Sequence, residues 1–154
     1  MEERKKGKIL AVCQSKEKGT VKVDIKEGLL LENYGLQGDA HTGNWHRQVS
    51  LLSIESINKM KEKGWELKPG DFAENLTIEG LELFQLPLGS KLKIGDKALL
   101  EVTQIGKECH QGCEIRKKIG DCIMPREGIF TRVIKGGKVK VGDIVEVLED
   151  DEDD

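Results

Sequence analysis

The apolar residues of this chain occur in short runs rich in Val, Ile and Leu, and glycines separate many of the runs. The 154 residues contain 18 Gly but only three Pro. Several runs alternate apolar and polar residues, the pattern of a strand with one buried face and one face in solvent. Glycine turns between such runs favour many short strands over long helices. The sequence therefore predicts a mainly β fold with strands at residues 8–13, 21–25, 29–32, 49–52, 76–78, 91–94, 98–104, 129–135 and 139–148.

One pattern occurs twice, in residues 91–96 (KLKIGD) and 138–143 (KVKVGD). Each copy has alternating lysines, a Gly-Asp turn and a following strand, so we expect the same hairpin to be built twice. We find no internal linker, and the length suits one domain. The prediction is a flexible N-terminus at 1–7, a single closed or bent β-barrel at 8–148 and a disordered acidic tail at 149–154.

One helix is predicted after the fourth of these strands. Ser53 can cap a helix over residues 54–63, and Glu55 would stand in its first turn, where the helix dipole favours an anion. Gly64 supplies the stop. A second, shorter helical turn is expected at residues 114–118.

Charge and cysteine usage exclude several classes of protein. The formal net charge is −3, but the last six residues are all acidic, and without those six negative charges the rest of the chain carries +3. So weak a positive field suits a small anionic ligand and argues against nucleic acid. The chain lacks a long apolar run and an apolar segment after its charged start, which argues against a membrane span and a secretory signal. The four cysteines are then expected to be reduced thiols in the cytoplasm.

The segment 104–122 holds three of the four cysteines. A reactive thiol needs a lowered pKa, which neighbouring cations provide, and Lys107 and His110 flank Cys109. Cys109 is therefore the candidate nucleophile, and the alternative is that it is a small buried apolar residue. Cys13 ends an apolar strand, so we expect it in the core.

A metal site is an alternative use of the same segment. Cys109, Cys113, Cys122 and His110 are four thiolate or imidazole ligands within fourteen residues. Only the first two cysteines have the spacing of a structural zinc pair, and adjacent Cys and His side chains converge poorly on one ion. The spacing also differs from the common iron–sulfur motifs.

The glycine-punctuated segment 34–50 is a second candidate. Its histidines, His41 and His46, and the planar guanidinium of Arg47 suit a phosphate, although the spacing of a phosphate-binding loop is absent. The same segment also reads as a solvated loop, or as a metal site in which Asp39 joins the two histidines. Asn75, at a loop-to-strand junction, also fits a simple Asx turn.

Taken together, these segments resemble the molybdenum cofactor sulfurase C-terminal (MOSC) domain family, in its short bacterial stand-alone form. The motifs occur in the family's order and span about residues 8–148. They are GLQGDAH (35–41), RQVSLL (47–52), AENLTI (73–78), IGD (94–96), LEVTQ (100–104), the downstream Cys109, GDCIMPREGIF (120–130) and VGD (141–143).

The resemblance implies a pyruvate kinase-type β-barrel and a role in handling the molybdenum cofactor. The family's characteristic thiol falls on Cys109, which would carry sulfur as a persulfide or ligate molybdenum. The pterin part of the cofactor carries a phosphate. The resemblance therefore implies that this phosphate is contacted by Arg47, Ser50, Asn75 and Lys107, with His41 nearby.

Two departures from relatives shape the expected partners. Amidoxime-reducing relatives carry Arg-Pro-Asn where this chain has Ala73-Glu74-Asn75, which removes a guanidinium and puts a carboxylate next to any bound phosphate. Full sulfurases fuse this domain to a pyridoxal-phosphate cysteine desulfurase, for which 154 residues leave no room. We therefore expect no pyridoxal phosphate site, a separate desulfurase as sulfur donor, and a molybdoenzyme or cofactor-synthesis protein as acceptor. The open alternatives are a non-catalytic molybdopterin- or metal-binding module and a Cys-rich, metal-stabilised β domain.

Overall fold

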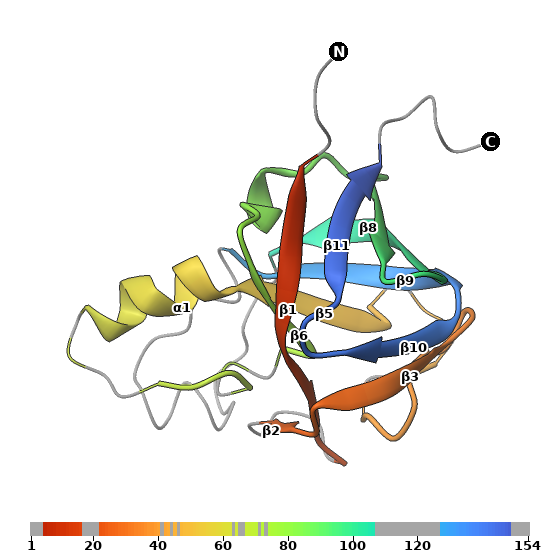
Figure 1. Ribbon diagram of the computed structural model, residues 1–154, viewed down its shortest axis with the longest axis horizontal. Coiled ribbons are helices and arrows are strands. Elements are labelled where there is room, and N and C mark those ends of the chain that lie inside the picture. The colour runs from red at the N-terminus through yellow and green to blue at the C-terminus, as the bar shows by residue number, and fades with distance from the viewer. Residues whose placement is uncertain are drawn as a thin grey trace.

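The computed structural model describes residues 5–16, 22–40, 42–43, 45, 47–62, 64, 67–70, 72, 74–106 and 127–148. Its centre is a closed barrel in which β11, β7, β8, β9, β5, β6 and β1 are neighbours in that order and β11 pairs again with β1 (Figure 1). The mainly β barrel predicted from the sequence is confirmed. The strands of the barrel are β1 (Lys6–Gln14), β5 (Val49–Ser53), β6 (Leu76–Glu79), β7 (Lys91–Ile94), β8 (Ala98–Ile105), β9 (Ile129–Lys135) and β11 (Ile144–Leu148).

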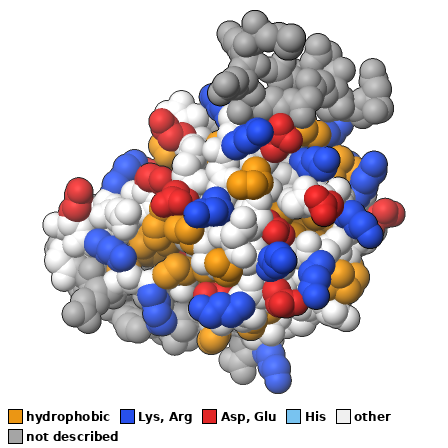
Figure 2. All heavy atoms as spheres, viewed as in Figure 1, with side chains coloured by type: hydrophobic (Ala, Val, Ile, Leu, Met, Phe, Trp, Pro, Cys, Tyr) orange, Lys and Arg blue, Asp and Glu red, His pale blue; other side chains and the backbone are white. Residues whose placement is uncertain are grey.

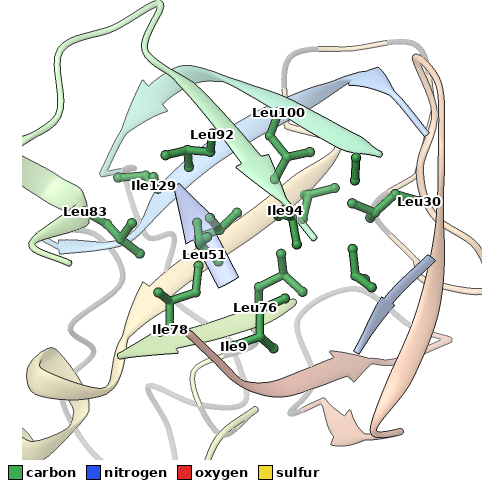
Figure 3. Packing of buried hydrophobic residues seen from close by; sticks show 14 of the residues in the cluster. Ile9, Leu30, Leu51, Leu76, Ile78, Leu83, Leu92, Ile94, Leu100 and Ile129 are labelled. Atoms are coloured by element: carbon green, nitrogen blue, oxygen red, sulfur yellow. The ribbon is translucent and has the colours of Figure 1, made fainter. Parts of the chain in front are cut away.

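The barrel forms because alternate residues of each strand are apolar and point inward. In β7, Leu92 and Ile94 are fully buried, whereas Lys93 between them is exposed. Figure 3 shows such side chains from many strands meeting inside the barrel, among them Ile9, Leu51 and Leu100. Each fully buried aliphatic side chain contributes about 1.5–3 kcal/mol, so this interior is the main source of stability.

The strands β5 and β6 are parallel, and the helix α1 (Ile54–Lys61) lies between them in the chain. Ser53 caps the helix as predicted, its side chain accepting a hydrogen bond from the Ser56 amide at 3.3 Å. The helix ends two residues earlier than predicted, and Gly64 has the positive φ of +101° that favours glycine in the turn after it. Ile57 and Met60 form its buried face. The predicted helical turn at 114–118 lies outside the described residues.

A second sheet of three strands flanks the barrel. It consists of β10 (Gly137–Lys140), β3 (Glu27–Leu31) and β4 (Gly35–Leu36), while β2 (Val23–Asp24) pairs with the end of β1. The 3-10 helix η1 (Leu83–Gln85) and β4 are elements that the sequence analysis missed, because each is only two or three residues long.

The sequence prediction was wrong for residues 139–148, which form two strands instead of one. Gly142 has a φ of +97°, and the Asp143 carboxylate accepts a hydrogen bond from the Lys140 amide, so the chain turns there. The predicted second hairpin is also wrong. β7 and β8 form a hairpin, but β10 pairs with β3 while β11 pairs with β7 and β1.

The N-terminal boundary also differs from the prediction of a flexible segment at 1–7. Lys6 and Gly7 belong to β1 and pair with Glu146 and Val145 of β11, because this pairing closes the barrel. The predicted acidic tail, 149–154, lies outside the described residues. Within the part of the chain that the structure describes, no helix combines the length and apolar character needed to cross a membrane.

Candidate functional site

Arg47 precedes β5, and its side chain reaches over the outer face of β9. Its Nε donates a hydrogen bond of 3.0 Å to Oε1 of Gln104, on the far side of β9. The guanidinium carbon lies 5.3 Å from the ring centre of Phe130 and 5.9 Å from that of Trp45. Contacts with two aromatic rings, together with one directed hydrogen bond, limit the positions that this flexible side chain can take.

The same contacts place Arg47 at the point where the cysteine-rich segment leaves the barrel. Gln104 Nε2 donates to the Gly106 carbonyl at 2.7 Å, and the Gly106 amide donates to the Gly128 carbonyl at 2.7 Å. We call Gly106 and Gly128 the neck. The segment 107–126, which includes Cys109, lies outside the described residues, and the glycines of the neck are the described residues that flank it beside Arg47.

The return side of the neck is fixed to helix α1. Ser56 Oγ donates to Oε1 of Glu127 at 2.5 Å, and Lys59 Nζ lies 2.9 Å from its Oε2. Ser53, the helix cap, is hydrogen-bonded in turn to Ser56 at 2.9 Å. The helix thus acts as the support for the chain that returns to β9.

Ser50 and Asn75, both predicted as cofactor contacts, lie together in the interior. Asn75 Oδ1 accepts from the Ser50 amide at 2.9 Å and from Ser50 Oγ at 3.2 Å. Asn75 Nδ2 donates to the Cys13 carbonyl at 3.0 Å. Asn75 is fully buried and Ser50 nearly so. The amide of Asn75 therefore fastens together the strands β1, β5 and β6.

Asp39, a candidate metal ligand in the sequence, forms a buried ion pair. Its Oδ1 lies 2.7 Å from Lys22 Nζ, and both side chains have 0% exposure. The same oxygen accepts from the Ser15 amide at 3.1 Å, which ties the GLQGDAH segment to the end of β1. Lys22 already balances the charge of this carboxylate, and the two histidines proposed beside it, His41 and His46, lie outside the described residues.

Glu74, the carboxylate expected next to any bound phosphate, is also fully buried. Its Oε2 accepts from the Gly70 amide at 2.9 Å and from Thr77 Oγ1 at 2.6 Å, whereas Oε1 has no hydrogen-bond partner among the described residues. Burial raises the pKa of this carboxyl. Glu74 therefore holds the turn at Gly70 and does not present its charge to a ligand at the surface.

Cys13 is buried, which confirms its predicted place in the core. Burial, and to a lesser degree the nearby Glu74 and Asp24 carboxylates, raise the pKa of its thiol. A thiol whose ionisation is suppressed in this way is a poor nucleophile. Cys13 is therefore unsuited to carry sulfur.

Several of the predicted site residues fall in segments that the structure does not describe. Cys109, Lys107 and His41 lie outside the described residues, as do the remaining residues of the metal alternative, which are Cys113, Cys122 and His110. Within the described part of the chain, no group of three or more Cys, His, Asp and Glu side chains is arranged to hold a metal ion.

The surface shown in Figure 2 carries lysine, arginine and acidic side chains interspersed, without a broad region of one sign. A groove of about 530 Å³ lies between the start of β1 and η1, lined by Lys5, Lys6, Gly80, Leu81, Glu82, Gln85 and Leu86. None of the predicted site residues lines it.

Sequence reasoning found Arg47 but missed its three partners. Gln104, Trp45 and Phe130 carry no local signal, since Gln104 is 57 residues from Arg47 and Phe130 reads as an ordinary strand residue. The Gln-Ile-Gly sequence at the end of a predicted strand was the one available hint, because a glycine there marks a place where the chain leaves the sheet.

The sequence profile of the MOSC domain family matches residues 38–146, which is most of the chain. The chain belongs to the MOSC domain family. This MOSC domain has no match among curated proteins. The matched residues include Arg47, Gln104 and both neck glycines.

Solved structures share the fold of this MOSC domain. The YUAD protein from Bacillus subtilis is 23% identical with a TM-score of 0.80, over 96% of this chain and 98% of that one. YiiM from Geobacillus stearothermophilus is 19% identical with a TM-score of 0.71, over 93% of this chain and 75% of that one. YiiM from Escherichia coli is 21% identical with a TM-score of 0.64, over 96% and 71%. At such identities the likeness shows the fold alone.

Proposed function

We propose that this MOSC domain handles the molybdenum cofactor in the cytoplasm, with Cys109 as the thiol that carries sulfur for the cofactor's sulfuration. The observation that carries the proposal is the placement of Arg47. Its cationic group is fixed beside the neck from which the Cys109 segment leaves the barrel. An anion-binding group and a thiol-bearing segment at one place suit a phosphate-bearing cofactor and a sulfur carrier.

The residues present fit the phosphate of the pterin. Among the described residues, no carboxylate pairs with the Arg47 guanidinium, whereas Arg132 is paired with Glu101 at 2.8 Å. The charge of Arg47 can therefore pair with an external anion, and its planar guanidinium can donate hydrogen bonds to two phosphate oxygens. Lys107 and His41 are the further contacts that we propose, while Ser50 and Asn75 hold the strands beneath. When bound, the cofactor supplies a metal that accepts sulfur.

The proposed sulfur step uses a partner, which makes the protein a sulfurtransferase-type component. The Cys109 thiolate attacks the terminal sulfur of a persulfide on a separate cysteine desulfurase. A new S–S bond forms at Cys109, the S–S bond of the donor breaks, and the donor cysteine leaves as a thiolate. No oxidant is consumed, because the sulfur keeps its oxidation state. A molybdoenzyme or cofactor-synthesis protein is the proposed acceptor.

The test is transfer of radiolabelled sulfur from a cysteine desulfurase to the protein. We expect Cys109→Ser to abolish the label and Cys113→Ser, a matched control four residues away, to retain it. The circular dichroism spectra of both variants should match the wild type. Equal labelling of Cys109→Ser and wild type would remove Cys109 from this role.

A second candidate function is a non-catalytic module that binds molybdopterin and delivers it, because Arg47 favours an anion whether or not Cys109 reacts. A titration with molybdopterin, followed by tryptophan fluorescence, tests it. Arg47→Ala should weaken binding strongly and Arg132→Ala should not. Absence of binding to the wild-type protein would eliminate this function.

A further inference from the structure

We propose that Gln104 is a positioning residue that couples an anion bound at Arg47 to the backbone of the neck. The inference rests on the proposed anion-binding function of Arg47. It adds that anion binding changes the conformation of the neck, from which the Cys109 segment leaves the barrel. It depends on described residues only: Arg47, Gln104, Phe130 and the neck glycines.

A β-bulge aims Gln104 at Arg47. In β8, Glu101 faces outward opposite Arg132, and Val102 faces the core opposite Thr131. The register then shifts, so that Gln104 and not Thr103 stands opposite Phe130. With regular alternation Gln104 would point into the apolar barrel, whereas the extra residue turns it to the outer face.

Two hydrogen bonds of the Gln104 side-chain amide connect Arg47 with the neck. Its Oε1 accepts from Arg47 Nε at 3.0 Å, and its Nε2 donates to the Gly106 carbonyl at 2.7 Å. The Gly106 peptide is bonded in turn to the Gly128 carbonyl. The side-chain amide of Gln104 is planar and rigid. A movement of the Arg47 guanidinium that displaces Oε1 therefore also displaces Nε2. Arg47 and the neck are thus joined through one side chain.

Phe130 makes the connection directional. Its ring lies beneath the guanidinium and is only 5% exposed, so the guanidinium cannot move inward. The guanidinium can still move toward or away from an external anion, and this movement displaces Oε1 of Gln104. By linkage, an anion that favours one position of Arg47 also favours one position of the neck.

The experiment is a titration of ¹⁵N-labelled full-length protein with inorganic phosphate, observed by NMR at Arg47 Nε and at the Gly106 and Gly128 amides. In the wild type, phosphate should shift all three signals with one dissociation constant. Gln104→Met keeps the size of the side chain but removes both hydrogen bonds. In this variant the Arg47 signal should still respond, with affinity lowered about fivefold or more, while the neck signals stay still.

Two more variants keep the test decisive. Arg47→Lys retains a positive charge but lacks the Nε–H donor, so phosphate binding should weaken yet remain measurable, without a response at the neck. Gln85→Met, in η1, is the matched control and should behave as wild type. A merely structural Gln104 would change the free spectrum but leave the phosphate response of Gly106 intact, which would overturn the inference. A wild type in which phosphate leaves Arg47 unperturbed would overturn the anion site as well.

Discussion

Replacing Asn75 with alanine tests whether this amide holds three strands together. Its side chain makes three buried hydrogen bonds, two with Ser50 and one with the Cys13 carbonyl. Removal leaves the Ser50 amide and the Cys13 carbonyl without these partners. Each buried polar group that loses its partner costs about 1–3 kcal/mol. We therefore expect the free energy of unfolding to fall by about 2–6 kcal/mol, a large part of the about 5–15 kcal/mol typical of a domain.

The assay is urea unfolding followed by far-ultraviolet circular dichroism. Asn75→Ala should lower the midpoint without changing the slope, since the surface exposed on unfolding is unchanged. Asn58→Ala, on the exposed side of α1, is the matched control and should leave the midpoint almost unmoved. A loss below about 0.5 kcal/mol for Asn75→Ala, the size of an ordinary surface substitution, would refute the reasoning that this amide fastens β1, β5 and β6.

Three further predictions concern buried charge and metal. The raised pKa of Glu74 means that the native state binds its proton more tightly than the unfolded chain. Stability should therefore fall as pH rises above the ordinary carboxyl value of 4.5. The Glu74→Gln variant should lose less stability than the wild type over that pH range. The measurement is the urea midpoint of both proteins from acid to alkaline pH, and midpoints that change in parallel would contradict the prediction. Asp39→Asn leaves the Lys22 ammonium buried without a counter-charge and should cost about 3–5 kcal/mol. The double variant Lys22→Met with Asp39→Leu should lose less stability in thermal unfolding than Asp39→Asn. An equal or greater loss would contradict the idea that the unpaired Lys22 charge causes the destabilisation. Elemental analysis of protein purified without added metal should find no stoichiometric zinc or iron. One ion per chain, lost in Cys113→Ser, would instead support the metal-stabilised alternative.

Much of the barrel could be predicted because its signal is local. The strands at residues 91–94 and 129–135 have the predicted bounds, the first because apolar residues alternate with lysines and the second because β-branched and aromatic residues fill most of it. The cap at Ser53 was predictable for the same reason, as its side chain and the helix amide it binds are three residues apart. The error at residues 139–148 arose where β10 and β11 join different neighbours, a choice that alternation does not encode.

The candidate site depended far more on contacts between distant residues. Arg47 could be selected by residue type, but its fixed position comes from Gln104 and Phe130, which only the pairing of β8 with β9 brings beneath it. Asn75 was interpretable as a simple turn residue until the closed barrel placed it between Ser50 and Cys13.

The sequence by itself determined the strands, the helix cap and the family, because each depends on the order of residues along the chain. Only the tertiary structure decided the roles of the polar side chains. Asp39 resembled a metal ligand and Glu74 a carboxylate next to a bound phosphate, yet both are buried, one paired with Lys22 and the other bonded to the turn at Gly70. Burial removes water from a carboxylate and makes it dependent on the partners that lie nearby. Lys22 lies 17 residues from Asp39 along the chain, whereas Gly70 and Thr77 lie within four residues of Glu74, and in both cases only the folded structure buries the carboxylate with its partners.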